Sequence, residues 1–186
     1  MRYRLWVLIA SGLFIIGLAA GLAVSAANPA GIVDYFSKEL SALESFSAIL
    51  GPFQVSTAVF IFLKNASVLL FSFIFSPILC LIPFLALALN GMLLSFVSAI
   101  VVQKESLGLV LAGLLPHGII EIPAIIIGEA ASLSFGTMVI ISLFSRKRRN
   151  QLLPNLKQNL KYLLLALALL VPAAIIETFI TPLLLK

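Results

Sequence analysis

The stretch that decides the fold is Leu115-Pro116-His117-Gly118-Ile119-Ile120-Glu121. It lies inside an apolar run from Leu107 to Phe144, in which Glu129 is the only other charged residue. Ionisable groups are costly in hydrocarbon, so in membrane helices they usually mark a function or an obligatory internal pairing. The chain's single histidine and the glutamate four residues after it therefore mark where a polar network or chemistry is expected.

The composition indicates an integral membrane protein. The chain has 186 residues, of which 62% are hydrophobic and 10% are charged, whereas a soluble domain carries about 25% charged residues. No long polar segment is present that would form a second domain, so residues 1–186 are predicted to form a single transmembrane domain. Cys80 is the only cysteine, which excludes an intramolecular disulfide and a cysteine-rich metal site. No cofactor is expected.

The apolar segments predict an all-α, polytopic transmembrane helix bundle. The first runs from Trp6 to Val24, which is long enough to cross a core of about 30 Å and too long for the apolar part of a signal peptide. Further helices are expected near residues 56–76 and 84–102, and the last apolar segment covers 160–185. With residues 107–144, these segments predict about five net crossings.

The segment between the first two spans has a different pattern. From residue 31 to residue 52, apolar side chains recur at steps of three and four, with charged residues between them. This spacing is typical of an amphipathic helix. We expect an amphipathic helix at 31–52 that lies on the external membrane surface or packs over the bundle.

The distribution of basic residues predicts the orientation. Lysine and arginine concentrate on the cytoplasmic side of membrane proteins. This rule places the N-terminus, with Arg2 and Arg4, and the Arg146–Arg149 cluster in the cytoplasm of a multi-pass protein of the cell membrane. The C-terminus at Lys186 is then external.

That orientation requires residues 107–144 to make one net crossing. As a straight helix this segment would be about 57 Å long, which exceeds one crossing. A broken or re-entrant segment is therefore predicted at 107–128, with its bend near Pro116 and Gly118.

Small residues predict two close helix contacts. Gly17 and Gly21 form a small-xxx-small pair on one face of the first helix, and Gly12 adds a third small residue. Asn90 and Gly91 stand inside an apolar run, where glycine permits close approach and asparagine can hold a neighbouring backbone.

A candidate buried polar site follows from this topology, because several costly residues fall in the outer half of the membrane. Its members are Lys64, His117, Glu121, Glu129 and Glu177. His117 and Glu121 would share one helical face. Such a set is compatible with a structural polar network, a metal site, a proton relay or the passage of an ion or substrate. Phosphate-loop, zinc-protease and nucleophile-elbow motifs are absent from the sequence.

Several sequence segments resemble the stage II sporulation protein M family. The most specific is Leu115–Ala124, which is similar to the family's signature. Asn65, the pair Asn90-Gly91 and Gly136 are similar to other recurrent positions, and Ile176–Pro182 resembles the close of family members. The resemblance implies a membrane protein with about five spans, in which the histidine and glutamate of the signature are important.

In spore formers, one family member is implied to scaffold cell-wall hydrolases during engulfment. That sporulation role is not transferred to this chain, because its sequence has no large extramembrane segment for wall chemistry. The first function expected is a scaffold or assembly component for other membrane or envelope proteins. A transporter or ion pathway that uses His117 and Glu121 is the alternative, and an intramembrane metal-dependent enzyme is a third option. The expected partners are membrane lipids and other membrane proteins, with a homo-oligomer as a further option. Nucleic acid is not expected, because the Arg146–Arg149 cluster adjoins a membrane end and suits anionic lipids.

Overall fold

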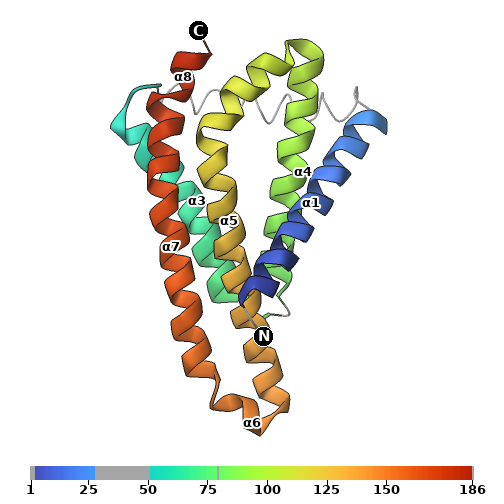
Figure 1. The fold of residues 1–186 in the computed structure, drawn as a ribbon, viewed down its shortest axis with the longest axis vertical. Helices are drawn as coiled ribbons and strands as arrows, with labels where there is room; N and C mark the ends of the chain where they lie inside the picture. The colour runs from blue at the N-terminus through green and yellow to red at the C-terminus, as the bar shows by residue number, and fades with distance from the viewer. Residues whose placement is uncertain (1–2, 28–50, 79, 186) are drawn as a thin grey trace.

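The computed structural model of the protein describes residues 3–27, 51–78 and 80–185, and all regular secondary structure in these ranges is helical. The all-α prediction is therefore confirmed. Five of the described helical segments are long and apolar enough to cross a membrane, which agrees with the predicted spans. The helices, shown in Figure 1, are α1 (Tyr3–Ala27), α3 (Val55–Phe75), α4 (Leu81–Lys104), α5 (Leu107–Phe144), α6 (Arg146–Arg149), α7 (Leu152–Phe179) and α8 (Thr181–Leu184).

The amphipathic helix predicted at 31–52 lies outside the described residues, apart from Gly51 and Pro52, which precede α3 and are not helical. Immediately after them, the backbone N–H of Phe53 donates a hydrogen bond to the carbonyl oxygen of Thr178 at 3.2 Å. This bond attaches the start of α3 to the end of α7.

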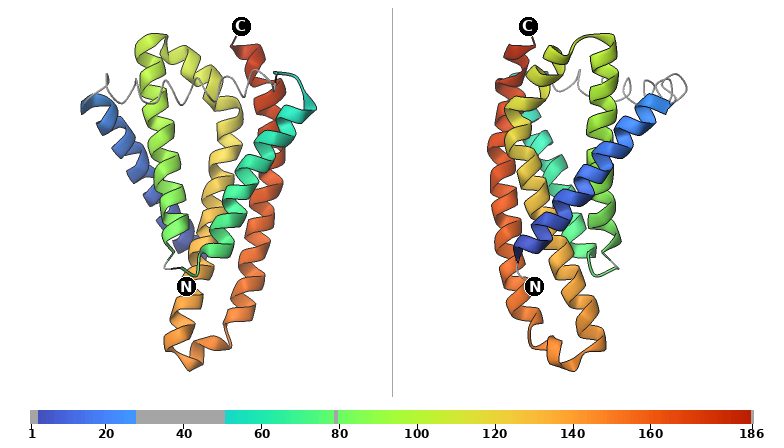
Figure 2. Two further views of the ribbon diagram at one scale, coloured as in Figure 1. Left: turned by 180° about the vertical axis from the view of Figure 1, so that it is seen from behind. Right: turned by 45° about the vertical axis from the view of Figure 1, so that its right-hand side comes forward.

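The long helices pack mainly as two pairs. α1 makes its most extensive contacts with α4, and α5 with α7, while α3 packs against both α5 and α7. One apolar core joins α3, α5 and α7 and includes Leu69, Ala124 and Leu170. A second core joins α1, α4 and α5 and includes Phe14 and Leu87. Figures 1 and 2 show that α1 and α5 adjoin near the N-terminus and diverge toward the upper end, where the C-terminus lies; the opposite end, which carries α6, is here called the lower end.

α1 and α4 cross with their backbones in contact at glycines. A Cβ atom on Gly17 or Gly21 would collide with carbonyl groups of α4, and one on Gly91 would collide with the carbonyl of Phe14 in α1. The close contacts predicted at these three glycines are therefore confirmed. Gly12 takes no part, because a Cβ there would meet nothing within 4 Å.

α5 is helical from Leu107 to Phe144, so the broken or re-entrant segment predicted at 107–128 is corrected to a bend in a continuous helix. Figure 1 shows the bend near the start of α5, where the ribbon changes from yellow-green to yellow. Pro116 and Pro123 lie inside the helix. A proline removes one backbone hydrogen bond and displaces the preceding turn, which bends a helix without ending it. Because hydrocarbon cannot hydrogen-bond to free backbone groups, the helix is retained.

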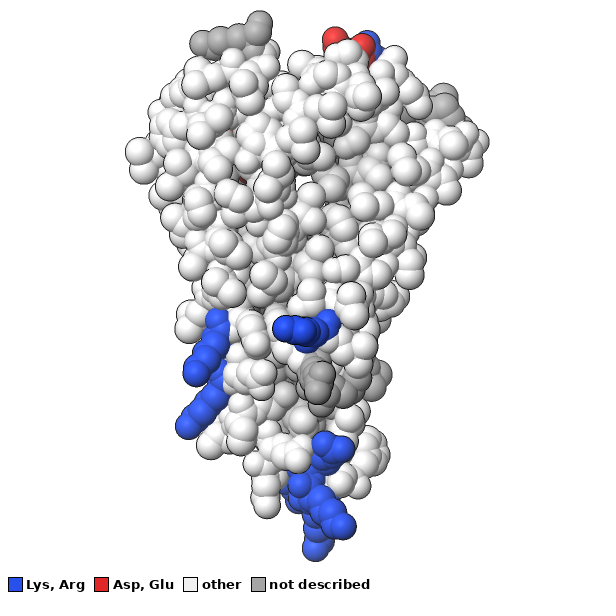
Figure 3. All heavy atoms as spheres, in the orientation of Figure 1, with Lys and Arg blue, Asp and Glu red and all other residues white. Residues whose placement is uncertain are grey.

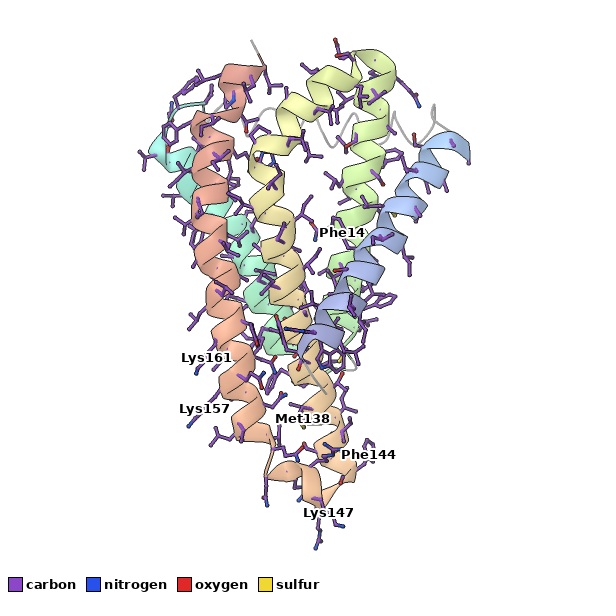
Figure 4. The ribbon with its side chains drawn as sticks, in the orientation of Figure 1. Phe14, Met138, Phe144, Lys147, Lys157 and Lys161 are labelled. Atoms are coloured by element: carbon purple, nitrogen blue, oxygen red, sulfur yellow. The ribbon has the colours of Figure 1, made fainter. Side chains whose placement is uncertain are left out.

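The remaining length of α5 is accommodated at the lower end. There α5 and α7 extend past the other long helices and are connected through α6 (Figures 1 and 2). α7 begins at Leu152, earlier than the apolar segment predicted from residue 160. Figure 3 shows basic side chains gathered over this lower part, and Figure 4 labels Lys147, Lys157 and Lys161 among them. The bend and the extension together allow α5 to run only once along the bundle.

Tyr3 attaches the lower end of α1 to the second helix pair. Its hydroxyl donates a hydrogen bond to the carbonyl oxygen of Ile127 in α5 at 2.7 Å. Its ring stacks on Tyr162 of α7, with ring centroids 3.5 Å apart and planes 6° apart. The two helix pairs are thus joined where they adjoin, below the region in which they diverge.

Candidate polar site between α3, α5 and α7

His117 and Glu121 lie on one face of α5, one turn apart. Their spacing of four residues brings Nε2 of His117 to 3.8 Å from Oε2 of Glu121. Both side chains are mostly buried, with 13% and 19% of their surface exposed. The pair predicted from the sequence is therefore a real contact within the bundle.

Asn65 of α3 fixes the orientation of the Glu121 carboxylate. Its Nδ2 donates a hydrogen bond to Oε1 of Glu121 at 2.9 Å, between residues that are far apart in the sequence. The NH2 group of an asparagine side chain can only donate, so Oε1 of Glu121 is the acceptor. The other carboxylate oxygen, Oε2, remains directed toward His117. The recurrent asparagine of the family resemblance thus has a direct structural role beside the site.

Thr181 holds the other side of the histidine ring. Its Oγ1 lies 3.4 Å from Nδ1 of His117 and donates to the carbonyl oxygen of Ile176, also at 3.4 Å. Sequence reasoning did not single out Thr181 as a site residue. It stands where α7 ends and α8 begins, and only packing of this junction against α5 brings it to the histidine.

Glu177 of α7 completes the cluster. One ligand atom each from His117, Glu121 and Glu177 lies within 4.8 Å of the others. Lys64, which is exposed on α3, is close enough to interact electrostatically with both carboxylates. Four of the five side chains predicted for the site are thus brought together.

Glu129 does not belong to this cluster. It lies eight positions after Glu121 on α5, a rise of about 12 Å. It is completely buried, and neither carboxylate oxygen makes a hydrogen bond with the described residues. Ser72 of α3 lies beside it, outside hydrogen-bonding geometry. Glu129 is therefore a separate buried acid, and its predicted place in the site is corrected.

The other motif residues have different structural roles. Asn90 donates from Nδ2 to the carbonyl of Ala86 in its own helix at 2.7 Å, so it holds the backbone of α4. Gly118 is buried, but a Cβ there would meet its neighbours only at ordinary contact distance. The packing around residue 118 therefore does not require a glycine at this position.

Two adjoining cavities lead to the site. The smaller, about 150 Å³, is lined by His117, Glu121 and Glu177 together with apolar side chains. One of these is Phe14, which Figure 4 labels on the α1 side. The larger, about 720 Å³, is lined mainly by α4 and the first part of α5 and includes Lys64. Both cavities share the lining residues Asn90, Leu94, Leu114 and Glu177.

The polar groups of this site can hold a cation or protons. An imidazole and two carboxylates offer nitrogen and oxygen lone pairs, and a neighbouring ammonium offsets part of the negative charge. The cavities give this cluster a route to the protein surface.

These features define a polytopic α-helical membrane protein with a buried histidine–carboxylate site. The chain belongs to the family described as stage II sporulation protein M, whose family model matches residues 10–182. It is also similar to two proteins of Methanocaldococcus jannaschii. One is the uncharacterized protein MJ0793, with 35% identity over 100 residues that cover 53% of this chain and 56% of the relative. The other is the uncharacterized protein MJ0706, with 33% identity over 110 residues that cover 58% of this chain and 50% of the relative.

The matched region thus spans about half the length of each of these two relatives. No solved structure matches the chain.

Proposed function

We propose that this protein forms a pathway for a cation or for protons in the membrane, with His117, Glu121 and Glu177 as its binding site. The observation that carries this proposal is the pair of adjoining cavities that reach the two carboxylates from the surface of the bundle. If the site served only helix packing, we would expect it to be enclosed, with every polar side chain paired with another protein group. Ionisable residues that face an internal cavity are typical of ion and proton pathways.

A flux measurement tests the pathway. Purified protein reconstituted into liposomes should dissipate an imposed proton or cation gradient, and Glu121→Gln should reduce the rate to that of protein-free liposomes. Glutamine keeps the shape of the side chain but cannot carry the negative charge that attracts a cation or accepts a proton. Glu105→Gln is the matched control, because Glu105 is exposed between α4 and α5, outside the site.

Equal rates for the native protein, Glu121→Gln and protein-free liposomes would contradict the pathway. That result would favour our second proposal, in which the protein is a scaffold or assembly component. That role is supported by the lower extension of α5 and α7, which offers a partner a surface away from the other long helices. Its exposed basic residues, Arg146–Arg149, Lys157 and Lys161, suit anionic lipids or an acidic partner surface.

We further propose that the lower end faces the cytoplasm and that the C-terminus is external. The support is that the N-terminal end of α1 and the basic residues of α6 lie toward the same end of the bundle. A membrane-impermeant maleimide should therefore label Leu184→Cys in intact cells, and Arg148→Cys only after permeabilisation.

The labelling requires removal of the native cysteine by Cys80→Ala. Burial raises the pKa of the Cys80 thiol, so it reacts slowly, but its removal makes the signal unambiguous. Labelling of Arg148→Cys in intact cells would reverse the proposed orientation.

A further inference from the structure

The hydrogen bonds around His117 determine which ring nitrogen carries a proton. The Thr181 hydroxyl donates to the carbonyl of Ile176, which can only accept. The Thr181 oxygen is then left with lone pairs for Nδ1 of His117, so Nδ1–H is the donor in that contact. In the neutral ring this places an unprotonated Nε2, with its lone pair, on the side of Glu121.

Three side chains with acceptor atoms therefore lie close together. The Nε2 lone pair of His117 faces Oε2 of Glu121 at 3.8 Å. One ligand atom from each of His117, Glu121 and Glu177 lies within 4.8 Å of the others. Asn65 donates to the other oxygen of Glu121, Oε1. Among the described residues, no hydrogen bond is donated into the space between the three atoms. Lone pairs that face one another repel unless a positive charge lies between them.

We propose that His117, Glu121 and Glu177 bind a divalent transition-metal ion through Nε2 and one oxygen of each carboxylate. This inference rests on the proposed pathway and specifies the class of cation that its site binds. Two carboxylates and a neutral imidazole carry the charge that a divalent cation neutralises, which matters where the dielectric constant is low. An imidazole ligand favours zinc, copper, iron or nickel over magnesium and calcium, which prefer oxygen ligands alone.

The surroundings have the features of a metal site. Ligand atoms lie about 2.0–2.2 Å from a bound zinc ion, so small side-chain rotations would draw the three atoms inward from their present spacing. Asn65 and Thr181 contact the atoms of Glu121 and His117 that do not face the proposed ion, and such contacts commonly orient metal ligands. The cavity of about 150 Å³ leaves room for a water at a further coordination position. An ion held by three protein ligands and one water can enter and leave.

Metal titration of the purified protein in detergent tests the site. Co²⁺ should bind with the visible absorption of a low-coordinate site, and Zn²⁺ should compete with it. His117→Gln, Glu121→Gln and Glu177→Gln should each weaken binding by more than about 100-fold, and Thr181→Val by about 10- to 100-fold. Glu129→Gln, which removes a buried carboxylate of the same helix outside the site, should bind as the native protein does.

Thermal unfolding separates loss of binding from loss of fold. Zn²⁺ should raise the unfolding temperature of the native protein, because it binds the folded state, and should not raise that of the ligand variants. The metal-free unfolding temperatures of Thr181→Val and the native protein should be close. Equal Co²⁺ affinity in the native protein and the three ligand variants would overturn the proposal, and so would a native protein with no Co²⁺ absorption and no Zn²⁺ stabilisation.

The two proposals fail differently. If Glu121→Gln abolishes flux but no transition metal binds, the metal site is wrong and protons or another cation occupy the pathway. If Co²⁺ binds through the three ligands but no gradient is dissipated, the metal site stands and the pathway is wrong.

Discussion

Gly91→Leu should cause a large loss of stability, because it separates α1 from α4. Even the first side-chain atom at this position would collide with the backbone carbonyl of Phe14. Because backbone atoms cannot move aside as a flexible side chain does, the two helices must separate. Overpacking costs typically about 1–3 kcal/mol, and we expect the upper end of this range or more.

Trp6 provides the measurement. It is the only tryptophan of the chain, and it packs against the apolar core that joins α1, α4 and α5. Its fluorescence during thermal unfolding in detergent therefore reports the release of α1. Gly12→Leu is the matched control, because a Cβ at Gly12 meets nothing within 4 Å. If both variants unfold at the same temperature, the close approach of α1 and α4 is wrong.

Glu129→Leu should have the opposite effect and stabilise the protein. The carboxyl group is completely buried, and neither oxygen has a hydrogen-bond partner among the described residues. An unsatisfied buried polar group costs about 1–3 kcal/mol. Leucine of similar size removes this cost, so the free energy of unfolding should rise by about that amount.

Glu129→Gln separates the effect of charge from the effect of polarity. Glutamine keeps polar atoms in the same apolar environment beside Ser72, so its gain should be smaller than that of leucine. Thermal unfolding of both variants in detergent gives the comparison. A loss of stability in Glu129→Leu would show that the carboxyl group has a stabilising partner in the native protein.

The number of spans could be predicted because long apolar segments and the breaks between them are properties of the local sequence. The bend in α5 could not be predicted in the same way, because hydropathy gives the length of an apolar run but not the direction that its helix takes. The run from Leu107 to Phe144 is longer than one crossing needs, and a break in the helix is the simplest explanation from the sequence alone. The structure keeps the helix, bends it, and lets its far end extend along α7.

The meeting of Lys64, His117, Glu121 and Glu177 could be predicted from their shared depth in the membrane. Glu129 shows the limit of that reasoning. Eight residues after Glu121 it is about two turns lower and rotated by about 80° around the helix axis. That rotation directs it away from the site, and sequence position alone gave only its approximate depth.

Thr181 could not be found from the sequence, because its role depends on how the junction of α7 and α8 packs on α5. A threonine four residues after a glutamate near the end of a helix has no distinctive signal. Only the three-dimensional arrangement places its hydroxyl 3.4 Å from the histidine ring.

The bend in α5 has a geometrical consequence. α4 ends at Lys104 and α5 begins at Leu107, so the first part of α5 connects the upper end of α4 to the region beside α7. This same part of α5 lines the cavity of about 720 Å³. The separation of the two helix pairs at the upper end is therefore set by the angle within α5. A change in the separation of the helix pairs at the upper end would therefore change that angle, while Tyr3 continues to join α1 to α5 and α7 below.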